Sequence, residues 1–340
     1  MHKTKFASYC TNRLPEGCRF CVKGRKLVLF ITGICSRNCF YCSLSEKRKN
    51  KDIVWANERR CARPEDAIAE AIASRAEGAG ITGGDPLIVL DRTLKYAKAL
   101  KSKFGKKFHI HIYLPTKLVT SEKLKKLSKY VDEIRFHPDF LNDESIEKVK
   151  LAGMFWKKSN IGIELPVFPD KAKETFNFIA KASPFIGFAN LNELEISDTN
   201  FSYITKRYKM NKGGYAVKGS KEAGLKILKM CEQAGLKLNV HFCTAETKNF
   251  YQYQNRIKLR EILPYGFRTE SGSARYFAIY GDVKRLMKEL RKFKEIYFDY
   301  KNKRAIISEK IVPKLINRYK IARVEELPTY DAVVIEKEEL

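Results

Sequence analysis

Long apolar runs are absent from this sequence. No segment approaches the length needed to cross a bilayer, and the first residues, Met1 to Lys5, lack the apolar stretch of a signal peptide. The sequence contains no internal repeat. The charged stretch Lys47 to Lys51 is its one low-complexity segment. With 340 residues and 44% hydrophobic content, the chain can bury a sizeable core. We therefore expect a globular, cytoplasmic protein without a membrane segment.

Acidic residues are scarce, with 39 Asp and Glu against 66 Lys and Arg, which leaves a formal net charge of +27. Such a surface attracts polyanions, so RNA, and tRNA in particular, is the first partner to consider. The segment Tyr251 to Arg260 mixes aromatic and cationic residues, which suits base stacking but equally a solvated amphipathic helix. A heat-adapted surface, or compensation of thiolate charge, also explains the excess of cations. The charge alone leaves these explanations open.

Cysteine spacing is the most specific feature that is present. Cys35, Cys39 and Cys42 follow the apolar strand candidate Leu27 to Thr32 in the pattern C-x3-C-x2-C. In a cytoplasmic protein such short spacings favour metal ligation over disulfides. Three thiolates on one loop can hold three irons of a 4Fe-4S cube, which leaves the fourth iron open for chemistry. A structural zinc site is the alternative, although its ligands usually come as two pairs.

A glycine pair, Gly83 and Gly84, stands at the end of the expected second strand and precedes Asp85 and Pro86. Two glycines permit a close backbone approach and positive φ angles, which is compatible with a bound zwitterion. A plain turn explains the same four residues. The position after a cysteine triplet and a helix favours the binding role.

The cysteine loop resembles the signature of the radical S-adenosylmethionine (SAM) enzymes, C-x3-C-x-aromatic-C, with Tyr41 at the aromatic position. The resemblance implies that the open iron binds the amino and carboxylate groups of SAM. It further implies that one electron from the cluster cleaves SAM to a 5'-deoxyadenosyl radical, which abstracts hydrogen from a substrate. Gly83 to Pro86 is similar to the Gly-Gly-Glu-like motif of that family, which implies that Gly83, Gly84 and Asp85 hold the SAM amino group. Asp85 stands where glutamate is commoner, and this shortens the reach of its carboxylate.

The chain as a whole looks like the archaeal radical SAM proteins described as related to pyruvate formate-lyase activating enzyme. Besides the two motifs above, this resemblance rests on the segments Asn192 to Glu195 and His241 to Cys243. It implies that Glu164 lies on the strand beside the SAM adenosine. It also implies an electron donor such as ferredoxin or flavodoxin.

The substrate class stays open at this point. RNA modification is favoured by the charge, whereas a protein or peptide substrate, as for the activating enzymes, would make the charge incidental. A small metabolite is a third class. A nonenzymatic Fe-S binding module is the alternative to an enzyme, and Gly83 to Pro86 argues against it. The cobalamin pattern Asp-x-His-x-x-Gly does not occur, so we expect no cobalamin domain.

A second set of cysteines, Cys10, Cys18 and Cys21, lies upstream and needs a fourth ligand for a closed site. We take Cys243 as that ligand, because it ends a late strand. A second 4Fe-4S cluster is the preferred interpretation and zinc the alternative, since thiolates suit both. Cys61 and Cys231 are expected to be small buried side chains.

Apolar strands, such as Ile161 to Val167, alternate with helical patterns, such as the helix from about Pro64 to Glu77, as in a βα barrel with a parallel sheet. The last apolar run, Ala332 to Ile335, is expected to be the final strand of the chain. We predict an α/β fold: a cysteine-containing segment over 1–26, a partial (βα)6 barrel over 27–265, and a ferredoxin-like α+β domain over 266–340, in the order β-α-β-β-α-β. Catalytic groups of barrels lie at the carboxyl ends of strands. The polar candidates there are Tyr113, Arg135, His137, Glu164, Glu195, Asp198, Asn200 and His241.

Overall fold

The computed structural model of the protein describes residues 1–139, 142–212 and 214–340. The chain forms two compact units, Met1–Tyr253 and Gln254–Leu340. The second unit begins before residue 266, because α9 (Gln254–Leu259) belongs to it. In the described residues, no helix is long and apolar enough to span a membrane.

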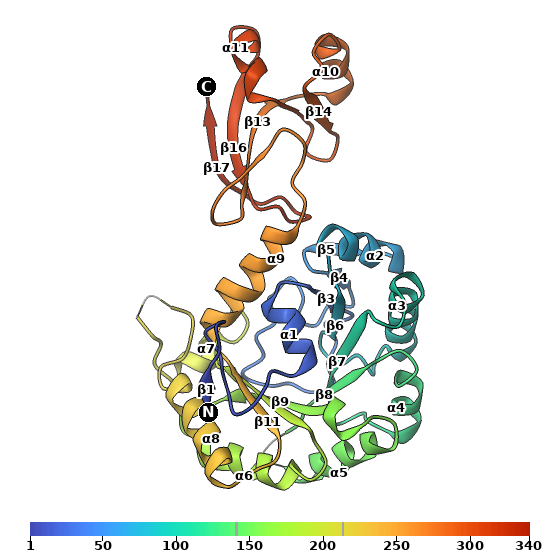
Figure 1. Cartoon of the computed structure of the whole chain (residues 1–340), viewed down its shortest axis with the longest axis vertical. Coiled ribbons are helices and arrows are strands. Elements are labelled where there is room, and N and C mark those ends of the chain that lie inside the picture. The colour runs from blue at the N-terminus through green and yellow to red at the C-terminus, as the bar shows by residue number, and fades with distance from the viewer. Residues whose placement is uncertain (140–141, 213) are drawn as a thin grey trace. The chain divides into compact units, whose positions relative to one another are not determined.

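Seven strands in the described part of the first unit run parallel, each beside the next along the chain. Six helices connect them and lie on the outside of the curved sheet (Figure 1). The strands are β3 (Lys26–Phe30), β6 (Gly78–Thr82), β7 (His109–Pro115), β8 (Glu133–His137), β9 (Ile161–Val167), β10 (Phe188–Glu193) and β11 (Asn239–Cys243). The helices are α2 (Pro64–Ala73), α3 (Leu90–Phe104), α4 (Ser121–Leu127), α5 (Glu144–Lys150), α6 (Ala172–Ala182) and α8 (Ser220–Gln233). The predicted partial barrel is confirmed, with one parallel strand beyond the sixth βα pair.

Short antiparallel strands extend both edges of this sheet, so the barrel stays open. The hairpin β4 (Val54–Ala56) and β5 (Arg59–Cys61) lies beside β3, and β2 (Tyr9–Cys10) and β1 (His2–Lys3) lie beside β11. The predicted cysteine-containing segment 1–26 is thus part of the barrel unit. Shorter helical elements in the loops are α1 (Glu16–Val22), η1 (Leu151–Met154), η2 (Lys158–Asn160), α7 (Phe201–Thr205) and the π-helix η3 (Thr247–Tyr253).

Successive side chains of the barrel strands point alternately into the hydrophobic core and into the barrel lumen. On β7, Ile110, Ile112 and Leu114 are fully buried among the apolar residues of the surrounding helices. Successive side chains of a strand point to opposite faces, so His111 and Tyr113 face the lumen. The core thus lies between sheet and helices, and the lumen is left for polar side chains.

The second unit contains a five-strand path with the order β14-β15-β13-β16-β17, and all its pairs are antiparallel. Its elements are β12 (Phe267–Arg268), β13 (Ala274–Tyr280), α10 (Val283–Leu290), β14 (Ile296–Asp299), β15 (Arg304–Ile307), η4 (Glu309–Ile311), α11 (Val312–Leu315), β16 (Ile321–Glu326) and β17 (Val334–Glu339). From β13 to β16 the element order is β-α-β-β-α-β, as in ferredoxin-like folds. The expected last strand over 332–335 is instead the start of the additional edge strand β17.

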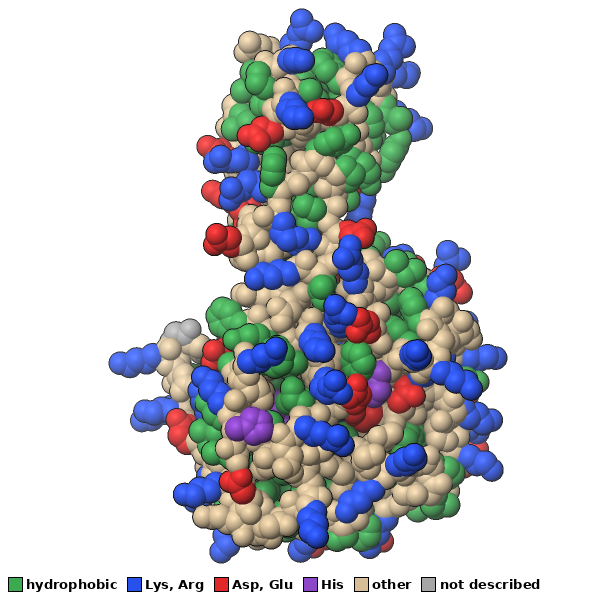
Figure 2. All heavy atoms as spheres, in the orientation of Figure 1, with side chains coloured by type: hydrophobic (Ala, Val, Ile, Leu, Met, Phe, Trp, Pro, Cys, Tyr) green, Lys and Arg blue, Asp and Glu red, His purple; other side chains and the backbone are tan. Residues whose placement is uncertain are grey.

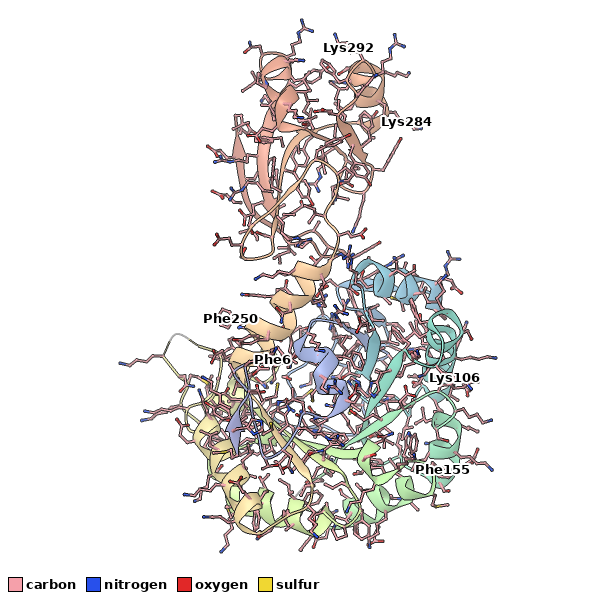
Figure 3. All side chains as sticks on the ribbon, in the orientation of Figure 1. Phe6, Lys106, Phe155, Phe250, Lys284 and Lys292 are labelled. Carbon is pink, nitrogen blue, oxygen red and sulfur yellow. The ribbon has the colours of Figure 1, made fainter. Side chains whose placement is uncertain are left out.

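The surface carries the excess positive charge without one dominant patch in view. Figure 2 shows Lys and Arg side chains scattered over the visible face of each unit, with acidic side chains among them. Lys106, Lys284 and Lys292 point outward from their elements (Figure 3). Dispersed cations of this kind are compatible with a solvated surface as well as with a polyanion partner.

Candidate active site at the mouth of the barrel

The cysteine loop leaves β3 at its carboxyl end. Cys35, Cys39 and Cys42 are partly exposed, whereas the other six cysteines are buried. The backbone N–H of Cys42 donates to the carbonyl of Cys39 (3.1 Å), and that of Arg37 donates to the sulfur of Cys35 (3.4 Å). Burial raises the pKa of the Cys35 thiol, and the Arg37 N–H acts in the opposite direction. The three thiols that the spacing predicted as ligands are thus the accessible ones.

The glycine pair packs directly against the backbone of this loop. Gly84 N donates to Thr32 O (2.7 Å), and Asp85 N donates to Ile34 O (2.8 Å). A Cβ on Gly83 would lie 2.3 Å from Thr32 O, and one on Gly84 would lie 2.1 Å from Ile34 O. Gly83 also has a φ of +146°, which favours glycine. Both glycines are therefore required by the close approach of two backbone segments.

The carboxylate of Asp85 does not line the cavity at this site, although the resemblance implied that it holds the SAM amino group. It is fully buried, with Oδ2 accepting from the Ser36 hydroxyl (2.5 Å) and Oδ1 from Leu87 N (2.9 Å). Burial raises its pKa, although both hydrogen bonds act in the opposite direction. In this arrangement Asp85 braces the cysteine loop.

The segment after β10 also holds the cysteine loop. The buried side chain of Asn200 donates to Tyr41 O (3.1 Å) and accepts from Ser197 N (2.7 Å). Thr199 donates to Cys42 O (3.2 Å), and Asp198 accepts from Glu46 N (3.0 Å). Asp198 and Asn200, predicted as strand-end candidates, therefore support the loop.

A cavity of about 360 Å³ opens beside the cysteine loop at the carboxyl ends of the strands. Its volume lies in the range of small-molecule and cofactor sites. Of the predicted site residues, those that line it are Cys35, Cys39, Cys42, Tyr41, Gly83, Gly84, Tyr113, His137, Glu164 and Glu195. The strand order thus brings together residues that are far apart in the sequence, as expected for a barrel.

Glu164 lies on the wall of this cavity and is held by three side chains. Its Oε1 accepts from Asn190 and from Asn192, both at 2.7 Å, and its Oε2 accepts from Arg135 at 3.3 Å. Asn192 itself lines the cavity. Sequence reasoning did not single it out, although its alternation with Asn190 on β10 could have indicated a lumen-facing position.

Lys248 of η3 lines the same wall, and its ammonium group lies 2.8 Å from the Glu195 carboxylate. Burial alone would lower the pKa of Lys248, but the Glu195 carboxylate, together with Cys243 and Glu164, outweighs burial and the pKa is raised. No local pattern in the sequence singles out Lys248, because nothing in the sequence indicates that the loop after β11 turns back into a π-helix. Such π-helices are frequent at functional sites.

Tyr41 and His137 form a hydrogen-bonded pair on the cavity wall, with 3.1 Å between the hydroxyl and Nε2. Burial, and then the charge of Arg37, lowers the pKa of His137 to about 4. The ring is therefore neutral at physiological pH. The tyrosine at the aromatic position of the cysteine motif is thereby fixed against β8.

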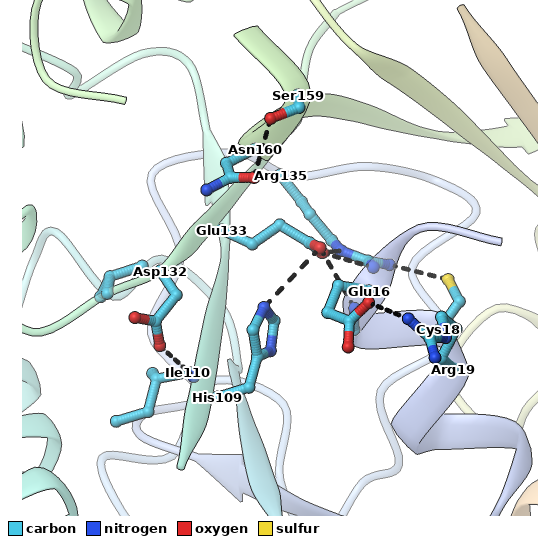
Figure 4. Close-up of polar contacts among 12 residues, drawn as sticks. Glu16, Cys18, Arg19, His109, Ile110, Asp132, Glu133, Arg135, Ser159 and Asn160 are labelled. Carbon is cyan, nitrogen blue, oxygen red and sulfur yellow. Dashed lines mark hydrogen bonds and ion pairs between the residues drawn. The ribbon is translucent and has the colours of Figure 1, made fainter. Parts of the chain in front are cut away.

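Below the cavity, the lumen is polar and is entered by α1. Gly17 N donates to Glu133 (3.1 Å), and Arg135 Nη1 lies 3.3 Å from Cys18 Sγ, as Figure 4 shows together with the Glu133–Arg135 contacts. A Cβ on Gly17 would lie 2.6 Å from Nδ1 of His111. Bulky branched residues usually fill a closed barrel. Here α1 and charged side chains take their place, so Arg135 is a buried lumen residue and does not line the cavity.

The second set of cysteines lies in or beside this lumen, and all four are buried. Cys18 faces Asn190 (3.6 Å), and Cys243 accepts from Gln252 Nε2 (3.3 Å). Cys10 instead contacts His2 (3.2 Å) and Asn12 O (3.4 Å). In the described residues, no three His, Cys, Asp or Glu side chains are assembled as a closed ligand set, either here or in the cysteine loop. Burial and then Arg135 lower the pKa of His241, beside Asn190, to about 3.

Comparisons with known proteins agree with this geometry. The family model described as "Radical SAM superfamily" matches residues 29–160. A protein of Methanocaldococcus jannaschii, provisionally named a glycyl-radical enzyme activating enzyme, is 38% identical over 354 residues, which cover 96% of this chain and 92% of that protein. The chain belongs to the radical SAM superfamily. Three partly exposed cysteines on one loop beside a cavity of cofactor size fit the 4Fe-4S cluster and SAM that this superfamily uses.

Two solved structures are more distant matches. SuiB of Streptococcus suis, bound to its precursor peptide SuiA, is 16% identical with a TM-score of 0.43, covering 65% of this chain and 48% of SuiB. The methyltransferase TsrM of Kitasatospora setae, with tryptophan and a SAM analogue bound, is 8% identical with a TM-score of 0.39, covering 60% of this chain and 46% of TsrM. This radical SAM chain thus spans less than half the length of either protein.

Proposed function

We propose that this radical SAM enzyme is an activating enzyme that takes a hydrogen atom from the α-carbon of a glycine in a protein partner. The name of the M. jannaschii relative supports this substrate class. The observation that carries the proposal is the composition of the cavity: the cysteine loop forms one wall, and groups able to bind peptide amides, Asn192, Glu195 and Lys248, form another. A backbone segment bound at that wall would face the site of radical formation.

In this proposal Cys35, Cys39 and Cys42 hold the cluster, while Gly83, Gly84 and Glu164 surround SAM. When bound, the cluster supplies the electron that cleaves SAM to methionine and a 5'-deoxyadenosyl radical. An external reductant such as ferredoxin or flavodoxin provides that electron. Transfer of a hydrogen atom from the glycine α-carbon to the 5' carbon would then leave 5'-deoxyadenosine and a glycyl radical. The cavity walls would hold the two reacting carbons together and exclude water.

The test uses anaerobically reconstituted full-length enzyme, dithionite, SAM and a glycyl-radical enzyme that was expressed with α-deuterated glycine. The expected result is deuterium in 5'-deoxyadenosine together with the electron paramagnetic resonance doublet of a glycyl radical. A Cys39→Ala variant is the control and should give neither signal. The protein-substrate assignment would be contradicted by two results together. The rate of 5'-deoxyadenosine formation would be the same with and without each partner tested, and the 5'-deoxyadenosine would carry no deuterium.

RNA is a second candidate substrate, which the net charge of +27 favours. In the second unit, Tyr276 of β13 is 2% exposed and its hydroxyl accepts from Leu263 N (3.1 Å), so this ring is not available for base stacking. Contacts between RNA phosphates and the dispersed lysines would lose affinity steeply with salt. Total tRNA that stimulates 5'-deoxyadenosine formation at low salt would favour this candidate over the protein partner.

A further inference from the structure

Three lumen side chains lie in register on neighbouring strands: Glu164 of β9, Asn190 of β10 and His241 of β11. Asn190 Nδ2 donates to Glu164 Oε1 (2.7 Å), and Nδ1 of His241 lies 2.5 Å from Asn190 Oδ1. The amide nitrogen of Asn190 thus faces Glu164 and its oxygen faces His241, and an amide oxygen only accepts. The Nδ1 atom of His241 must therefore carry the proton and donate it.

The other nitrogen of this neutral ring, Nε2, is left with a bare lone pair. His241 is 0% exposed, and Nε2 has no hydrogen-bond partner among the described residues. A buried polar atom without a partner is uncommon and calls for an explanation. A histidine that donates one N–H to a fixed acceptor and presents the other nitrogen unprotonated has the orientation of a metal ligand.

Three thiols share this part of the lumen with His241. Cys243 is two residues further along β11 and so projects from the same face. Cys18 and Cys21 are three residues apart on α1, which places them on one side of that helix. Cys18 Sγ lies 3.6 Å from the Asn190 oxygen that His241 also contacts. The π-helix η3, whose Gln252 donates to Cys243 Sγ (3.3 Å), packs against α1.

We propose that Cys18, Cys21, Cys243 and Nε2 of His241 bind a thiophilic metal centre, a zinc ion or a 4Fe-4S cluster, that joins α1 to the last barrel strand. Three cysteines and a histidine are an established ligand set for structural zinc, and thiolates also suit iron-sulfur clusters. Binding converts the three thiols to thiolates and releases their protons. This centre does not depend on the proposed function of the cavity.

Cations already lie beside two of the thiols, where they would offset the thiolate charge. Arg135 Nη1 lies 3.3 Å from Cys18 Sγ, and Lys26 lies close enough to Cys21 for an electrostatic interaction. Cys10, which the spacing suggested as a ligand, lies opposite His241 on β2, but its sulfur contacts His2. In this proposal His241 takes the place of Cys10 as the fourth ligand of the expected second site.

The test begins from the full chain with Cys35, Cys39 and Cys42 all changed to alanine, so that metal at the active-site loop does not interfere. This protein is reconstituted anaerobically with either zinc or iron and sulfide, and its metal content is measured by elemental analysis and Mössbauer spectroscopy. We expect about one zinc or about four irons per chain. The metal that binds in that ratio identifies the centre as a zinc site or as a 4Fe-4S cluster. A cobalt titration of the same protein should give the intense absorption of thiolate-to-cobalt charge transfer.

Further changes in that background test the ligands. Cys243→Ser and His241→Gln should each abolish stoichiometric binding, and Asn190→Ala should weaken it by about 10- to 100-fold because it frees the histidine ring. Cys231→Ser, at a buried cysteine of α8, is the matched control and should retain the metal. A background protein with native circular dichroism but without metal or a cobalt signal would overturn the proposal. Loss of metal with Cys10→Ser but not with His241→Gln would overturn the assignment of the fourth ligand.

Discussion

Ser36 of the cysteine loop donates a 2.5 Å hydrogen bond to Oδ2 of Asp85, which follows the glycine pair. The two residues are 49 positions apart in the sequence, and the bond joins the two motifs of the radical SAM signature. The other oxygen of Asp85 accepts from Leu87 N and thereby fixes the turn after Gly84. The carboxylate thus couples the position of the cysteines to the position of the glycines.

Replacing Asp85 by alanine should release the cysteine loop. The change leaves the Ser36 hydroxyl and the Leu87 N–H without their buried acceptor, at a cost of about 1–3 kcal/mol for each group. We expect a lower midpoint of thermal unfolding and a cluster that is lost faster to a chelator, measured by the decay of its visible absorption. Asp91→Asn, on the exposed first turn of α3, is the control. Unchanged cluster retention in Asp85→Ala would contradict the bracing role.

Gly84→Ala should impair cluster and SAM binding more than global stability. The added Cβ would meet Ile34 O at 2.1 Å, so the cysteine loop must move away from β6. Overpacking of this kind costs about 1–3 kcal/mol or more. Iron content per chain and the dissociation constant for SAM are the measurements. Gly153→Ala is the matched control, because its Cβ would have no neighbour within 4 Å. Equal iron content and SAM affinity in the two variants would refute the close-approach argument.

Local patterns predicted the barrel well, because strand alternation and helix starts depend on neighbouring residues. The strand over 161–167 was predicted with its observed bounds, and α2 begins at Pro64 as expected. Sequence patterns did not predict a strand that is short or carries charged residues. β16 (Ile321–Glu326) was missed because its exposed arginine and terminal glutamates conceal its alternation, and the apolar run near residue 334 was taken in its place.

The parts of the site that could not be predicted depend on contacts between distant residues. The spacing of Cys35, Cys39 and Cys42 is a local feature, so it could be recognised from the sequence. The glycine pair could be recognised for the same reason. The direction of the Asp85 side chain is not local, since Ser36 and Leu87 determine it. The place of Lys248 depends on the turn after β11 and on Glu195. Strand order, and not sequence spacing, decides which polar residues share the cavity.

Acid should destabilise the second unit through its buried ion-pair network. Arg304 binds Asp299 (2.9 Å) and both oxygens of Glu326 (2.7 and 2.8 Å), and all three residues are buried. Burial alone would raise the pKa of Asp299, but hydrogen bonds from Asn302 and Arg304 outweigh it and hold the pKa below its usual value. The unfolded chain then binds more protons than the folded one just below pH 4, so stability falls as the pH drops through that range.

Calorimetry of the full chain between pH 7 and pH 3 tests this prediction. The Asp299→Asn variant should unfold at a lower temperature at pH 7 and should lose less stability on acidification than the unaltered protein. Glu336→Gln, at an exposed position of β17, is the control and should titrate like the unaltered protein. The same loss of stability on acidification in Asp299→Asn would mean that another group is responsible.

Lys248→Met should impair capture of the protein partner more than binding of SAM. The ammonium group, held by Glu195, is the cation on the wall where we place the partner's backbone. Loss of a charge-assisted hydrogen bond costs about 1.5–3 kcal/mol, which corresponds to a rise of about 10- to 150-fold in the KM for the partner. The KM for SAM should change much less, because the proposed SAM contacts lie on other elements. Both constants are obtained from the rate of 5'-deoxyadenosine formation.

Removal of Lys248 also leaves the Glu195 carboxylate without its cation, so the double variant Lys248→Met/Glu195→Gln is needed to separate the two effects. If Lys248 contacts the partner, the double variant keeps a raised KM for the partner. If Lys248 serves only to neutralise Glu195, the double variant recovers the original KM. Lys229→Met, on the exposed face of α8, changes the net charge by the same amount and should leave both constants unchanged. A general electrostatic attraction of the partner would instead raise its KM equally in Lys229→Met and Lys248→Met, which would rule out a specific role for the cavity wall.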